Sequence, residues 1–324
     1  MKRDVVYDAV RAVCMLWIVG FWHLRDYLPM EYQFGKDLLH TGEIVTWGVL
    51  ASFAFISGLF LSKYKFETFG DVKFFYRKRI VRFFFLFFLA VISMYIAGLA
   101  FHQHFFLGFS QVIFCLLGIG SFIPPNAPTF WYISMMMFFY MITPIILFPK
   151  KPLNRISICT VILLFLILAL SFNIITVDSR LIVYMVFYCA GLLIPKTHVD
   201  KSKNPYFLFA GLLVLVIPIH NIWQSIISDT LIVIFLVAFA TLLCKLRLSK
   251  LFTVISYSSM AAYLFHRHIY LSFVFLFNMG SGTPLRDAAI PLWSVGIIIP
   301  IIFVISYFIQ SCYDIVYKKV STKC

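Results

Sequence analysis

Charged residues are scarce in this sequence, and acidic residues are the scarcest. Only 12% of the 324 residues are charged, with 13 Asp and Glu against 27 Lys and Arg, whereas soluble domains carry about 25% charged residues. Hydrophobic residues make up 62% of the chain, so a water-soluble globule would lack the polar residues needed to cover its surface. This composition excludes a soluble protein and predicts a membrane protein.

Several common functional motifs are also missing. The sequence has no GxGxxG turn, no Walker loop, no HExxH helix and no internal repeat. Its seven cysteines show no metal-ligand spacing, so we expect no metal site. The first 22 residues resemble a signal peptide, but Asp8 and Arg11 interrupt the apolar run and no small-residue cleavage site follows. These features favour an uncleaved first span.

The apolar residues lie in stretches near twenty residues, the length that an α-helix needs to cross ~30 Å of hydrocarbon. We predict an all-α polytopic membrane protein with ten transmembrane helices, folded as one membrane-embedded domain over residues 1–324. Residues 102–128 are expected to form a re-entrant or interfacial segment, with a full crossing by 105–123 as the alternative. The ten predicted spans are 5–27, 44–62, 80–101, 129–148, 156–175, 180–195, 206–222, 226–244, 252–277 and 289–316.

The basic residues orient these spans. With both termini in the cytoplasm, 21 of the 27 Lys and Arg fall in cytoplasmic segments and four in outer segments, which is the positive-inside pattern. A crossing by 105–123 would turn the later basic loops outward, so ten spans fit better. The net charge of +14 is therefore explained by insertion and contact with anionic lipid, and we expect no nucleic-acid partner.

Ionisable side chains inside predicted spans are costly unless paired or hydrated, so they are candidate functional residues. Asp8 and Arg11 lie three residues apart in the first span, on one helix face where they can pair. His23 lies near the outer end of that span. An interfacial anchoring pair and a water-facing histidine are the structural alternatives.

Two further candidates come from other spans. Arg267 follows His266 in the ninth span and must face a polar interior or a partner, because an arginine facing lipid at that depth is too costly. Arg79 and Arg82 lie three residues apart where the third span begins. Two guanidinium groups on one helix face can hold phosphate, although ordinary cytoplasmic anchoring also explains them.

Five sequence patches follow one another along the chain. They are Asp8-x-x-Arg11 with His23, Phe55-Ile56-Ser57-Gly58, Arg79-x-x-Arg82, Phe130-Trp131-Tyr132-Ile133-Ser134 with Tyr140 and Pro144, and Ser259-Met260-Ala261-Ala262-Tyr263-Leu264-Phe265-His266. Together and in this order, the patches resemble membrane acyltransferase family 3. The resemblance implies ten helices and transfer of an acyl group, commonly acetyl from cytoplasmic acetyl-CoA, to a hydroxyl of a bacterial surface glycan or glycolipid.

The resemblance also implies roles for matching residues. It ties Arg11 and His23 to catalysis and associates Arg79 and Arg82 with the acyl donor, acetyl-CoA. We expect His23 to act as general base on the acceptor hydroxyl, since imidazole titrates near neutral pH; a covalent acyl-histidine is the variant. Asp8, His266 and Arg267 complete the predicted catalytic group, with the last two near the oxyanion or the sugar, and Trp131 and Tyr132 are predicted to contact the sugar unless they belong to an interfacial aromatic belt.

The spacing of the first motif departs from the family pattern. Eleven residues, rather than the usual ten, separate Arg11 from His23. At 100° per residue this puts the two side chains about 120° apart on a regular α-helix. A π-bulge absorbs one residue and restores their common face, so we predict a bulge or local unwinding between Met15 and Phe21, with Gly20 as the weakest point.

Two other positions depart from the pattern. Met136 stands where many members have a glutamate, and Arg267 stands where an apolar or aromatic residue is usual. These departures keep two alternatives open: a transporter or flippase for a glycan or lipid, and a non-catalytic membrane subunit of polysaccharide assembly. For the enzyme we expect the bacterial inner membrane as location, and the lipid bilayer, a glycan or glycolipid acceptor and separate polysaccharide-assembly proteins as partners.

Overall fold

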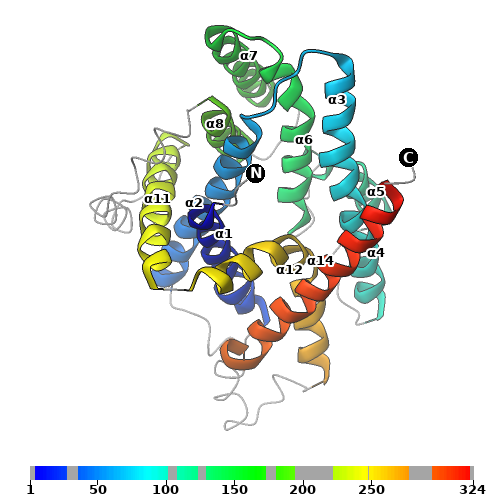
Figure 1. Cartoon of the computed structure of the whole chain (residues 1–324). Coiled ribbons are helices and arrows are strands. Elements are labelled where there is room, and N and C mark those ends of the chain that lie inside the picture. Colours follow the sequence, from blue (N-terminus) through cyan, green and yellow to red (C-terminus); the bar gives the residue numbers. More distant parts are fainter. Residues whose placement is uncertain are drawn as a thin grey trace. The chain divides into compact units, whose positions relative to one another are not determined.

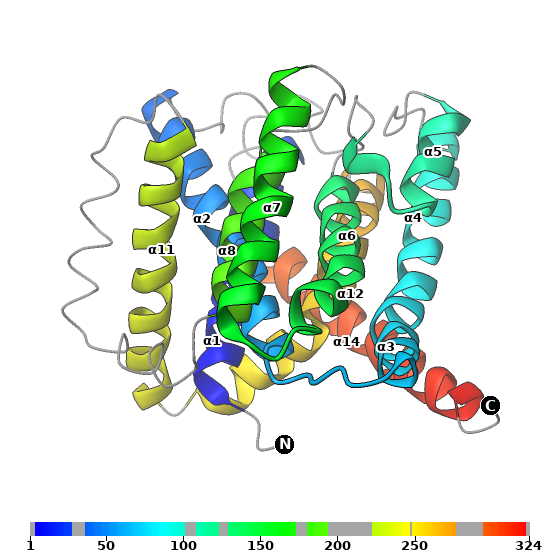
Figure 2. The ribbon, with the colours of Figure 1, turned by 90° about the horizontal axis from the view of Figure 1, so that it is seen from above.

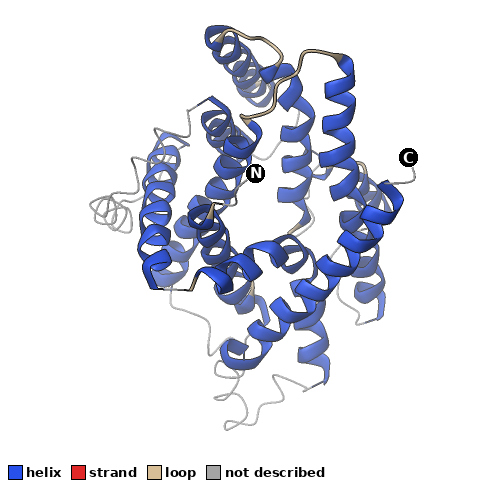
Figure 3. Cartoon of the chain, viewed as in Figure 1, coloured by secondary structure: helices blue, strands red, loops and turns tan. Residues whose placement is uncertain are grey.

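The computed structural model describes residues 4–27, 36–100, 108–122, 129–172, 180–193, 222–246, 248–276 and 294–321. Every secondary-structure element in these ranges is helical (Figure 3), as expected where backbone polar groups must be satisfied within lipid. Seven segments of the described chain are long and apolar enough to cross a membrane: Val5–Tyr27, His40–Leu61, Phe69–Ala100, Phe130–Leu147, Pro152–Ala169, Ser225–Leu246 and Gly296–Lys319. The described part of the chain is therefore all-helical, and the protein is an integral membrane protein.

These seven segments overlap seven of the ten predicted spans, and the third begins at Phe69 rather than at residue 80. Two more predicted spans, 180–195 and 252–277, correspond to α8 (Arg180–Leu193) and α12 (Ser249–Leu276), which are not among the seven. The predicted span 206–222 lies outside the described residues except for its last position. The total of ten spans and the orientation of the termini stay predictions.

The segment predicted to re-enter contains a short helix, α5 (Phe109–Leu116), followed by the 3-10 turn η5 (Gly120–Phe122). Eight residues of α-helix rise about 12 Å, well short of the ~30 Å hydrocarbon core. The flanking residues 102–107 and 123–128 lie outside the described part of the chain. The re-entrant path of this segment stays a prediction.

The chain divides into two compact units, and the first holds residues 1–52 and 201–324. Its elements are α1 (Val5–Trp17), η1 (Ile18–Trp22), η2 (Leu24–Tyr27), the start of α2 (Lys36–Leu61), α11 (Ile222–Leu243), η7 (Cys244–Leu246), α12, η8 (Ser294–Ile298) and α14 (Ile299–Ser321). Within this unit, α1 packs against both α11 and α12, and α12 also packs against α14 (Figures 1 and 2). The central helix α1 is buried on several faces, including Tyr7, Ala9, Val10 and Cys14.

The second unit spans residues 53–200. Its elements are the end of α2, α3 (Phe69–Tyr76), η4 (Arg77–Val81), α4 (Arg82–Ala100), α5, η5, α6 (Phe130–Leu147), α7 (Pro152–Ser171) and α8. A capping box starts α3: Thr68 accepts from the Asp71 backbone N–H, and the Asp71 carboxylate accepts from that of Thr68. Its core includes most of α6, whereas α7 exposes many apolar side chains, as a lipid-facing helix does.

Glycine allows α2 and α8 to approach closely within this second unit. A methyl group on Gly191 would overlap the carbonyl oxygen of Phe55, and one on Gly58 would overlap the carbonyl oxygen of Tyr188. Two small residues facing each other across a helix pair let the backbones touch, which is a common way to pack helices in membranes. Gly58 belongs to one of the five motif patches, so at this position the motif serves packing.

Gly191→Ala should destabilise the protein by about 1–3 kcal/mol, because the added methyl group meets backbone that cannot rotate away. Thermal unfolding in detergent measures the effect. Gly296→Ala is the matched control, since a methyl group there would meet no atom within 4 Å. Equal melting temperatures for the two variants would contradict the close approach of α2 and α8.

Candidate functional site

The predicted bulge in the first helix is present. Residues Ile18–Trp22 form the π-helix η1, and the backbone N–H of His23 donates to the carbonyl of Ile18, five residues earlier, at 2.9 Å. This wider turn absorbs the extra residue between Arg11 and His23. His23 is only 8% exposed and turns toward α12, so it does not face lipid.

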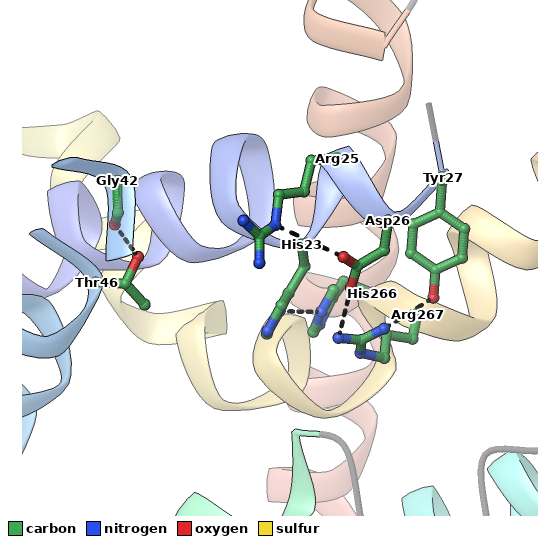
Figure 4. Close-up of polar contacts among 8 residues, drawn as sticks. All are labelled: His23, Arg25, Asp26, Tyr27, Gly42, Thr46, His266 and Arg267. Carbon is green, nitrogen blue, oxygen red and sulfur yellow. Dashed lines mark hydrogen bonds and ion pairs between the residues drawn. The ribbon is translucent and has the colours of Figure 1, made fainter. Parts of the chain in front are cut away.

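His23 pairs with His266 of α12 (Figure 4). The distance from Nδ1 of His23 to Nε2 of His266 is 2.7 Å, and the two ring planes are nearly parallel, at 4°. Nδ1 of His266 lies 2.9 Å from the carbonyl oxygen of Ala262, one turn earlier. Both rings are buried.

These contacts assign the protons on the two rings. A carbonyl oxygen only accepts, so Nδ1 of His266 carries a hydrogen and donates to Ala262. With both rings neutral, Nε2 of His266 is an acceptor and Nδ1 of His23 is the donor. Nε2 of His23 is then the unprotonated nitrogen of the pair, with a lone pair able to take a proton from a substrate.

Arg267 has the polar partner that its position in α12 demands. Its Nη2 lies 3.0 Å from Oδ2 of Asp26, and its Nη1 lies 3.4 Å from the hydroxyl of Tyr27. Figure 4 shows this group beside the two histidines. The prediction that Arg267 faces a partner is therefore confirmed. The partner Asp26 follows His23 by three residues.

Asp8 links the first turns of α1 to α12. Its carboxylate is buried and accepts a hydrogen bond from the Ser256 hydroxyl at 2.8 Å. Arg11 lies one turn further along α1 and is half-buried. The Asp8–Ser256 and His23–His266 contacts follow one another in the same order on both helices, so α1 and α12 run in the same direction. Pairing between Asp8 and Arg11 and their part in catalysis stay predictions.

The predicted donor residues belong to the second unit. Arg79 lies in the π-helix η4 (Arg77–Val81), and its Nη2 donates to the Tyr64 hydroxyl at 3.3 Å while the guanidinium lies 5.5 Å from the centre of the Tyr64 ring. Nε of Arg79 is buried and has no hydrogen-bond partner in the described structure. Arg82 begins α4 and is exposed. Arg79 is thus oriented by Tyr64 and retains an unused donor.

Trp131 and Tyr132, the predicted sugar contacts, lie in the first turn of α6. The guanidinium of Arg180 lies 4.0 Å from the Trp131 ring centre, and Tyr184 packs against both aromatic rings. Met136, one turn later, is buried and fills the place where a glutamate is usual in the resembled family. Sugar binding by Trp131 and Tyr132 stays a prediction.

The sequence model of acyltransferase family 3, described as an acyltransferase domain, matches residues 5–310, nearly the whole chain. The chain belongs to acyltransferase family 3. The resemblance based on five short patches is therefore confirmed, and the protein is a membrane acyltransferase. No curated protein and no solved structure gives a significant match.

The family match covers the candidate site, but some contacts there were not predicted. Asp26, Ser256 and Tyr270 contact the predicted site residues or η1, and the hydroxyl of Tyr270 donates to the Val19 carbonyl at 2.7 Å. A lone acidic residue three positions after His23 was the available sequence signal for Asp26. Within the described residues no group of three or more His, Cys, Asp and Glu is placed to hold a metal, and the expectation of a metal-free site stays a prediction.

Proposed function

We propose that this membrane acyltransferase is an O-acyltransferase that moves an acyl group, acetyl in the first instance, from acyl-CoA to a hydroxyl of a cell-surface polysaccharide or glycolipid. One observation carries the proposal: the hydrogen bond from His23 Nδ1 to His266 Nε2, itself fixed by the Ala262 carbonyl, leaves His23 Nε2 free to accept a proton. A histidine oriented by a second group is how many acyl-transfer enzymes hold their base.

The reaction balances with this one base. Nε2 of His23 takes the proton of the acceptor hydroxyl as its oxygen attacks the thioester carbonyl, and a new C–O bond forms. The tetrahedral intermediate then expels the thiolate of CoA as the C–S bond breaks. The His23 imidazolium returns its proton to that thiolate, giving an ester and free CoA thiol. Arg267, one residue beyond His266, places a cation near the developing oxyanion.

Binding of the acyl donor is assigned to Arg79 and Arg82 of the second unit. The phosphates of acyl-CoA are anionic, and charge-assisted hydrogen bonds from guanidinium groups suit them. Support comes from Arg79, whose side chain is held by Tyr64 and whose Nε is buried without a partner in the described structure. Because the donor is cytoplasmic and the acceptor is at the cell surface, the enzyme is proposed to lie in the bacterial inner membrane. Separate polysaccharide-assembly proteins are its proposed partners.

Membranes that contain the cell's own glycan, supplied with radiolabelled acetyl-CoA, test the function directly. Transfer of label to a glycan or glycolipid fraction supports the proposal, and comparison of glycan masses with those of a deletion strain identifies the acyl group and the sugar. Failure of wild-type membranes to transfer label from acetyl-CoA or longer acyl-CoAs would contradict it and would favour a non-catalytic assembly subunit.

Arg79→Ala should raise the apparent KM for acyl-CoA roughly tenfold or more, since a hydrogen bond to a charged group contributes about 1.5–3 kcal/mol. The kcat at saturating donor should stay within about twofold. Lys78→Ala is the matched control, because Lys78 is an exposed neighbouring cation beside the Phe74 ring. An unchanged KM in Arg79→Ala removes the phosphate assignment and leaves that of His23 intact.

A further inference from the structure

We propose that Asp26 and Arg267 are positioning residues for His23. Their ion pair ties the turn after His23 to α12 beside His266, and so sets the hydrogen bond that keeps Nε2 of His23 available as base. This inference rests on the proposed function of His23; it adds Asp26 as a residue that acts through His23, and it gives Arg267 a positioning role besides its charge near the oxyanion. Asp26 itself has no other assigned role.

The backbone around His23 lacks the hydrogen bonds between residues four apart that hold a side chain's direction in an α-helix. The N–H of His23 bonds to Ile18, five residues back, and the carbonyl of His23 accepts from the N–H of Asp26, three residues on, at 3.2 Å. His23 therefore sits between a π turn and the 3-10 turn η2. A single π turn is rare, and a 3-10 turn has poorer hydrogen-bond geometry than an α-helix, so we expect tertiary contacts to hold the residue.

Helix α12 supplies those contacts on both sides of His23. Before His23 in the chain, the Val19 carbonyl inside η1 accepts a hydrogen bond from the buried Tyr270 hydroxyl at 2.7 Å. After His23, Asp26 and the Tyr27 hydroxyl both bond to Arg267. The Tyr27 ring also lies 4.9 Å from the Tyr270 ring. His23 is thus held between two anchor points that both belong to α12.

The ion pair is placed to control the alignment of the two rings. Asp26 follows His23 by three residues and Arg267 follows His266 by one, so the distance between the charged groups is linked to the distance between the imidazoles. Arg267 is 8% exposed, and a buried guanidinium without a carboxylate would move toward water or draw solvent in. Either response would shift His266.

The neighbouring Arg25 offers a contrast within the same turn. Its guanidinium lies 3.5 Å from the centre of the Trp22 ring and its Nε lies 3.7 Å from Oδ1 of Asp26. Both of these contacts stay within the segment that carries His23 and do not reach α12. Arg25 therefore carries the same charge as Arg267 and also contacts Asp26, but it does not connect the segment of His23 to α12.

Asp26→Asn and Arg267→Gln should each lower kcat for acetyl transfer about 10- to 100-fold, the scale expected when a catalytic group is displaced by an ångström. The KM for acetyl-CoA should change less than about twofold, because the donor phosphates are bound elsewhere. Arg267→Lys, which keeps a cation beside Asp26, should lose less activity than Arg267→Gln. Arg25→Gln is the matched control and should keep wild-type kcat.

Nitrogen NMR of the ¹⁵N-histidine-labelled full-length protein in bilayers gives a readout independent of activity, with the His23 signals assigned by difference from His23→Ala. Wild type should show His23 protonated at Nδ1 only, and Asp26→Asn should show a mixture of tautomers. Wild-type kcat and an unchanged tautomer in Asp26→Asn overturn the inference. A kcat loss that merely follows a lower melting temperature, with the tautomer unchanged, also overturns it, whereas full activity of His23→Ala removes the proposed function itself.

Discussion

His23→Ala should lower acyl transfer by about 10²- to 10⁴-fold, the usual contribution of a positioned general base. The loss should appear in kcat and in kcat/KM together, because the base acts in the transition state and does not bind the donor. His40→Ala is the matched control, since His40 is an exposed histidine on α2 of the same unit. Transfer of label from acetyl-CoA in membranes measures both variants.

His23→Gln extends this test to the ring nitrogens. Glutamine can donate an amide hydrogen bond toward His266 but has no basic nitrogen, so it should keep the melting temperature and still lose activity. If His23 instead became acylated, wild-type protein without acceptor would retain label from acetyl-CoA and His23→Ala would not. Full turnover by either His23 variant would remove the base assignment.

The location of His23 could be predicted because helical geometry is strict. A spacing of twelve positions between Arg11 and His23 cannot place both side chains on one face of a regular α-helix, so the sequence alone pointed to the bulge found at Ile18–Trp22. The helical segments could also be predicted, because hydrocarbon thickness sets their length. Both predictions rest on local rules.

The partners of the site residues could not be predicted in the same way. Asp26 meets Arg267 across 241 positions of sequence, and Asp8 meets Ser256 across 248. Such pairs depend on which helices pack together, and helix periodicity carries no information about that choice. The π turn at Arg77–Val81 was missed for another reason: the Arg79-x-x-Arg82 spacing contains no extra residue that would reveal a change of helical phase.

One buried ionisable residue of the first unit was not predicted as a site residue. Asp229 of α11 is 1% exposed, and neither of its carboxylate oxygens has a hydrogen-bond partner in the described structure. It lies inside the apolar segment Ser225–Leu246, where an ionisable residue is costly. The test that selected Asp8 and Arg267 selects Asp229 equally, although none of the five sequence patches includes it.

Inserting one alanine between Val19 and Gly20 should reduce acyl transfer by about 100-fold or more, because an added residue rotates everything after it by 100°. The existing π turn already absorbs one residue, so His23 would turn away from His266. Deleting Gly20 should have the opposite outcome. The π turn would close to a regular α-helix, His23 would keep its direction, and activity should stay within about tenfold of wild type.

Gly20→Ala is the length-preserving control for both changes. Its methyl group would lie 3.1 Å from Cδ1 of Ile299, the flexible end of a side chain that can move, so activity should be close to wild type. Melting temperatures of all three variants separate loss of the fold from loss of phase. An insertion variant as active as wild type, or a well-folded deletion variant that is inactive, would show that the bulge does not set the direction of His23. The contrast between insertion and deletion is informative because both alter the chain by one residue, and only the helical phase predicts that their effects differ.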